Sequence, residues 1–188
     1  MAGIALILIC MFTWSAIDSR KPQVLYMDIL NCNMGSDVNI SVLKEHYDFI
    51  YGKNYKMRLY YSDTIGIEHK KQYPTASSYA SFPAACAANM YDVVITDKDG
   101  LDWCTANSSI YAPVSVLSEE TMKMIADDLV SAYDKNGNLV DAAVNISDTE
   151  FAKSLNLPYD KIYLCFPGNN EENLYNAENL LNFIYNKQ

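Results

Sequence analysis

Polar side chains gather where three apolar stretches of this chain end. They are Asn31, Asn33, Ser62, Asp63, Asp97 and Asp99. Amides, carboxylates and hydroxyls can hydrogen-bond a small polar solute or a peptide segment, and a helix N-terminus beside them would add partial positive charge for an anion. The same residue types are the ordinary residues of helix caps and turns, so the alternative is that these side chains only shape their loops.

Trp103 follows the last of these loops by about one helical turn. An indole at the rim of a cleft can stack on a sugar ring, and we therefore include Trp103 among the candidate binding residues. A partly buried packing role is the alternative.

Asp97-Lys98-Asp99 has the DxD form with which some sugar transferases hold a divalent cation through nucleotide phosphates. Oxygen ligands suit such a cation, but no glycine-rich phosphate loop accompanies the two carboxylates. An envelope-associated, transferase-like enzyme that uses a metal on Asp97 and Asp99 is therefore the alternative function, not the leading one.

Other catalytic and metal-binding patterns are missing. His46 and His69 lie in polar stretches, no G-x-S-x-G elbow occurs, and the cysteines outside the first 17 residues (Cys32, Cys86, Cys104 and Cys165) form neither CxxC nor a Cys/His ligand spacing. We expect free, mostly buried thiols, although these four could also pair in an oxidising compartment. The sequence favours a non-catalytic protein with no cofactor and no bound metal.

Charge excludes one class of partner. With 14 basic and 23 acidic residues the net charge is -9, which repels phosphate backbones. The 15 tyrosines are spread along the chain without interleaved Lys or Arg. Nucleic acid is therefore not an expected partner.

The segments that must position these side chains alternate between strand-like and helix-like patterns. We expect strands at 24–31, 55–61, 91–97, 139–146 and 161–166, and helices at 38–50, 84–90, 101–106, from Ser118 to near Asp134, and through 174–184. The first two strands with their helix form a β-α-β unit, which predicts parallel pairing. Ligands of open α/β sheets bind outside the carboxyl ends of such strands, where the polar side chains lie.

The N-terminal segment 1–17 contains no charged residue and ends before Asp18. It has the minimal length of a membrane anchor and lacks the basic start of a cleaved signal peptide. We expect an anchor at 1–17, a linker at 18–23 and one α/β domain at 24–188. Arg20 and Lys21 follow the segment, and by the positive-inside rule they favour a cytoplasmic domain instead of an outward one.

Three stretches together resemble bacterial extracellular solute-binding proteins. They are the strand and acidic loop 91–99, the phrase Ile110-Tyr111-Ala112-Pro113-Val114, and the ending in which the strand Ile162-Tyr163-Leu164-Cys165-Phe166 leads through an Asn-rich turn to a helix with Asn176-Ala177 and Leu180-Leu181-Asn182-Phe183-Ile184. The likeness covers about two-thirds of residues 24–185.

The resemblance implies an open, mostly parallel, three-layer α/β/α sheet like one lobe of a periplasmic binding protein. The chain is too short for a second lobe of ordinary size, since only residues 115–145 correspond to that excursion. It further implies a membrane-anchored, extracytoplasmic domain at the cell surface or in the periplasm. Its expected partners are a small polar solute or peptide, and a membrane permease or other envelope protein.

Overall fold

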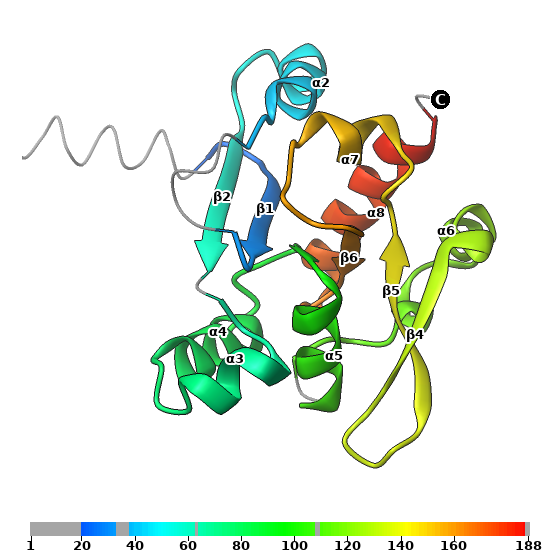
Figure 1. The fold of residues 1–188 in the computed structure, drawn as a ribbon. Coiled ribbons are helices and arrows are strands. Elements are labelled where there is room, and N and C mark those ends of the chain that lie inside the picture. Colours follow the sequence, from blue (N-terminus) through cyan, green and yellow to red (C-terminus); the bar gives the residue numbers. More distant parts are fainter. Residues whose placement is uncertain (1–19, 33–37, 63, 108–109, 187–188) are drawn as a thin grey trace, which may run out of the picture.

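The computed structural model describes residues 20–32, 38–62, 64–107 and 110–186, drawn as a ribbon in Figure 1. The strands are β1 (Gln23–Leu30), β2 (Lys56–Ser62), β3 (Val93–Thr96), β4 (Leu129–Tyr133), β5 (Leu139–Asn145) and β6 (Tyr163–Cys165). The helices are α2 (Ser41–Tyr51), α3 (Ile67–Gln72), α4 (Ser78–Ala87), α5 (Lys98–Ala106), α6 (Glu119–Met124), α7 (Glu150–Ser154) and α8 (Glu171–Asn186), with 3₁₀ turns at Val114–Val116 and Ala126–Asp128.

The strands form one six-stranded sheet in the order β2-β1-β3-β6-β5-β4. The expected α/β class is confirmed, and β1 pairs in parallel with both β2 and β3. The expectation of a mostly parallel sheet is wrong, because β3 with β6, β6 with β5 and β5 with β4 are all antiparallel. The parallel part is therefore confined to one side of the molecule.

The wrong expectation of a mostly parallel sheet originates in the helix predicted from Ser118 to near Asp134. Helix α6 ends at Met124, and Leu129, which lies inside the predicted helix, begins strand β4. Residues 129–133 (LVSAY) contain the strand formers Val130 and Tyr133 and lead directly into the Asn-Gly turn, which is the pattern of a hairpin. The Asn136-Gly137 pair closes this hairpin: Gly137 has φ 79°, and the amide of Asp134 donates to the carbonyl of Asn138 at 2.9 Å.

Two apolar clusters lie on opposite faces of the sheet, and helices cover both. On one face Met27 and Ile29 of β1 pack with α2, α7 and α8. On the other face Leu30 and Val94 pack with α4 and α5. The alternation of Met27, Asp28, Ile29 and Leu30 between the faces is the period of two expected for a strand, and it explains why a strand buried on both sides is apolar almost throughout.

The carboxylate of Asp92 fastens α8 to the sheet. Asp92 is 1% exposed and accepts hydrogen bonds from the amide of Tyr26 at 2.6 Å, from Asn173 at 2.5 Å and from Asn176 at 3.2 Å. Burial raises the pKa of this carboxyl, and the three donors act in the opposite direction. A single acidic side chain thus joins β1, the start of β3 and the final helix.

The four cysteines outside the N-terminal segment are free and buried, as expected from their spacing. Burial raises the pKa of Cys104 to about 12, so this thiol is protonated at neutral pH and is a poor nucleophile.

The predicted anchor, residues 1–17, lies outside the described residues. Within the described ranges no helix combines the length and the apolar character needed to cross a bilayer. The backbone of the predicted linker is described from Arg20, and the carbonyl of Pro22 accepts from the amide of Lys56 at 2.8 Å.

Candidate functional site

The carboxyl ends of β1 and β3 meet at a point where the direction of winding reverses. The chain leaves β1 through α2, on one face, to reach β2, and returns through α3 and α4, on the other face, to β3 on the opposite side of β1. The loops after two such strands diverge and leave room for a ligand. Asn31 and Asp97 directly follow these two strands.

Asn31 joins three segments at this edge. Its amide nitrogen donates to Oδ1 of Asp97 at 2.7 Å, and its amide oxygen accepts from the amide of Ile65 at 2.5 Å. Asn31 has φ 65°, a left-handed conformation that asparagine tolerates better than most residues. The short polar side chain and the backbone conformation therefore both favour asparagine here.

Asp97 is the N-cap of α5. Its Oδ1 accepts from the amide of Gly100 at 2.9 Å, in addition to the bond from Asn31. This bond satisfies one of the amides that a helix leaves free at its start. Gly100 leaves room for the close approach, because a Cβ there would lie 2.2 Å from Oγ1 of Thr96.

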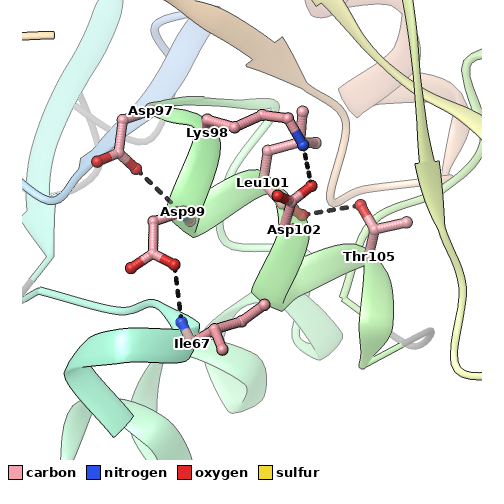
Figure 2. A network of polar contacts seen from close by, with 8 residues as sticks. Ile67, Asp97, Lys98, Asp99, Leu101, Asp102 and Thr105 are labelled. Atoms are coloured by element: carbon pink, nitrogen blue, oxygen red, sulfur yellow. Dashed lines mark hydrogen bonds and ion pairs between the residues drawn. The ribbon is translucent and has the colours of Figure 1, made fainter. Parts of the chain in front are cut away.

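Asp99 faces the segment that leads into α3, as Figure 2 shows. Its Oδ1 accepts from the amide of Ile67 at 3.0 Å. A Cβ on Gly66 would lie 1.8 Å from Oδ2 of Asp99, so any larger residue at this position would require the carboxylate to move. Asp97 and Asp99 thus each accept a hydrogen bond from a backbone amide near the start of a helix.

A cavity of about 370 Å³ opens beside these carboxylates. It is lined by Asp97, Lys98, Asp99, Pro158, Tyr159, Asp160, Lys161 and Tyr163. The start of α5 forms one wall, and the loop before β6 forms the other. The lining therefore combines both signs of charge with two phenol rings.

The charged and phenolic side chains of the cavity differ in whether they already have an ion-pair or hydrogen-bond partner. Lys98 forms an ion pair with Asp102 on the same helix (Figure 2), whereas Lys161 is exposed and makes no ion pair within the described part of the chain. The hydroxyl of Tyr159 donates to the carbonyl of Leu30. Burial raises the pKa of Tyr163, and the nearby Lys98 opposes that rise.

The described residues contain no group of three or more His, Cys, Asp or Glu side chains arranged to hold a metal ion. The Oδ1 atoms of Asp97 and Asp99 both accept from backbone amides. The proposed pair of carboxylates accordingly has no third protein ligand among the residues described.

The remaining sequence candidates are Asn33, Ser62, Asp63 and Trp103, of which only Trp103 has a described side chain, and it does not line the cavity. Asn33 and Asp63 lie outside the described residues, and Ser62 ends β2 with a side chain that is likewise not described. Trp103 is 5% exposed and packs edge-on against Tyr79, with ring centroids 5.1 Å apart. Nζ of Lys70 lies 5.4 Å from the centroid of the Trp103 ring and covers it.

Sequence reasoning missed the whole second wall, residues 158–163. The rule for open α/β sheets places ligands after strands, whereas residues 158–162 precede β6. Because β6 runs antiparallel to β3, with Thr96 opposite Tyr163, the start of β6 lies at the edge where β3 ends. The polar triplet Tyr159-Asp160-Lys161 indicates a site only when the direction of β6 is known.

Comparisons with protein-family models, with curated proteins and with solved structures found no match to this chain. The likeness to solute-binding proteins consequently rests on the sequence pattern alone.

Proposed function

We propose that this protein is a non-catalytic binding domain that holds a small zwitterionic solute, such as an amino acid or a short peptide, at the carboxyl edge of β1 and β3. We further propose that residues 1–17 anchor it in a membrane with the domain on the extracytoplasmic side. In that setting a permease or another envelope protein receives the solute.

The cavity between Asp99 and Lys161 carries this proposal. Its volume of about 370 Å³ falls in the range of small-molecule sites. A zwitterion needs one anionic and one cationic contact within a few ångströms, and the lining offers Lys98 and Lys161 together with Asp99 and Asp160. A simple anion or cation would meet groups of its own sign here.

In the proposed complex the ligand carboxylate pairs with Nζ of Lys161, and the ligand ammonium pairs with the carboxylates of Asp99 and Asp160. The free N–H groups at the start of α5 add partial positive charge beside the ligand carboxylate. The rings of Tyr159 and Tyr163 supply apolar contact for a side chain. Each polar group of the ligand thus has a partner of opposite character.

A thermal-shift screen of the full chain with amino acids, dipeptides, sugars and inorganic anions tests the proposal. A ligand present at one hundred times its Kd stabilises the folded state by about 2.7 kcal/mol, which is readily measured as a higher Tm. We expect zwitterions to raise Tm and to lose that effect in Lys161→Ala. Lys135→Ala, in the exposed hairpin turn, is the matched control and should keep the effect.

Two results would contradict the proposal. One is the absence of any shift with zwitterions at millimolar concentration, and the other is an equal shift in wild type and Lys161→Ala. Calorimetry with Mg²⁺ and Mn²⁺ on the wild type and Asp97→Ala addresses the enzyme alternative separately, since binding abolished by the substitution would favour a metal site.

A further inference from the structure

Helices α2 and α8 enclose a second cavity, of about 400 Å³, which shares no residue with the first. It is lined by His46, Tyr47, Ile50, Tyr51, Tyr175, Asn179, Asn182, Phe183 and Asn186. With histidine neutral, none of these side chains carries a charge, although the chain as a whole has 14 basic and 23 acidic residues. The lining is therefore a mixture of rings and amides.

The asparagines of α8 divide into two groups with different surroundings. Asn173 and Asn176 are each 2% exposed and donate to the carboxylate of Asp92. The side chains of Asn179, Asn182 and Asn186 line the cavity and make no hydrogen bond to any described residue. Asparagine is an unfavourable residue inside a helix, so Asn179 and Asn182 weaken α8 without a compensating hydrogen bond to any described residue.

Charged groups near this cavity are directed elsewhere. Glu178, on α8, accepts from the amide of Ser118 at 2.6 Å. Asp48, on α2, accepts from the hydroxyl of Tyr55 at 2.8 Å. Neither carboxylate is among the described residues that line the cavity.

The rings provide apolar faces beside the amides. Tyr175 is 63% exposed at the rim, and Tyr47 and Tyr51 stack with ring centroids 6.2 Å apart and an interplanar angle of 29°. The ring centroids of His46 and Phe183 lie 4.3 Å apart. The exposed ring of Tyr175 can pack against the C–H face of a sugar, while an amide can donate to one hydroxyl and accept from the next.

We propose that the cavity between α2 and α8 binds a neutral carbohydrate, with Tyr175 stacking on a sugar ring and Asn179, Asn182 and Asn186 hydrogen-bonding its hydroxyls. A charged ligand would find no counter-charge in this lining. A purely apolar ligand would cover the three amides without satisfying them, which is unfavourable. An uncharged ligand with several hydroxyl groups needs no counter-charge and can form hydrogen bonds with the three amides. This inference is independent of the function proposed for the first cavity.

Isothermal titration of the purified full chain with maltotriose, cellotriose and triacetylchitotriose tests the inference, with trigalacturonate as a charged probe of similar size. We expect at least one neutral trisaccharide to bind and trigalacturonate not to bind. Tyr175→Ala and Asn182→Asp should each weaken binding about tenfold or more. Tyr133→Ala, which removes a tyrosine of similar exposure (67%) from the β4–β5 hairpin, is the control and should bind as the wild type does.

Three outcomes would overturn the inference. They are no binding of any neutral trisaccharide at millimolar concentration, equal binding by wild type, Tyr175→Ala and Asn182→Asp, and self-association of the chain that Tyr175→Ala abolishes while no saccharide binds. The last outcome would assign this face to a second copy of the chain. Circular dichroism of each variant confirms that a loss of binding is not a loss of folding.

Discussion

Individual polar residues in this protein mostly join segments that are far apart in sequence. Asp92 collects donors from β1 and α8, and Asn31 links the loops after β1, β2 and β3. Both side chains have more than one partner, and those partners would be left unsatisfied by substitution. The loss of stability on substituting such a residue therefore depends on which hydrogen-bonding groups are left buried without a partner.

Replacement of Asp92 by alanine should destabilise the fold by about 3 kcal/mol, since it leaves the amides of Asn173 and Asn176 buried without their acceptor. Urea denaturation of the variant and the wild type measures the difference. Asp141→Ala is the matched control, because Asp141 is exposed and accepts only from Ser131 at 2.8 Å among the described bonds. Equal losses in the two variants would show that Asp92 does not fasten α8.

Elements are defined here as much by their ends as by their interiors. Helix α5 begins at a residue whose side chain caps it, and the β4–β5 hairpin turns at the one loop with an Asn-Gly pair. The capping aspartate and the Asn-Gly pair indicate both ends in the sequence. The interior of residues 119–134 is not indicated in the same way, because apolar residues three and four apart fit a helix while Val130 and Tyr133 in the second half also favour a strand.

The capping role of Asp97 predicts unequal effects of two substitutions. Asp97→Ala should lower the free energy of unfolding by about 1 kcal/mol, whereas Asp97→Asn, which can still accept from the amide of Gly100, should cost much less. Chemical denaturation of both variants provides the comparison. A loss as large in Asp97→Asn as in Asp97→Ala would show that the negative charge matters more than the cap.

Two properties describe the molecule as a whole. It has an excess of acidic over basic residues, and its sheet is parallel on one side and antiparallel on the other. The net charge of -9 makes the compact state repel itself. The antiparallel half brings the loop before β6 to the edge where the parallel strands end. The first property is fixed by composition, and the second depends on the path of the chain.

Self-repulsion predicts that added salt stabilises the fold. Raising NaCl from about 10 mM to about 200 mM shortens the Debye length from about 30 Å to below 10 Å, so the urea midpoint should rise. A series of denaturation curves at several salt concentrations measures this. A midpoint that falls with salt would mean that favourable ion pairs outweigh the net repulsion.

The sequence alone determined the α/β class, the positions of β1, β2, β3 and α8, the hairpin turn and the residues that follow β1 and β3, because these depend on local periodicity and on local backbone preference. Only the tertiary structure decided that β6 pairs antiparallel with β3, which places Lys161 across a cavity from Asp99. It also decided that α2 lies beside α8, which gathers rings and amides into a second cavity. These contacts join residues far apart along the chain, and their formation depends on which strand edges and helix faces bury the most apolar surface together, which no local pattern encodes.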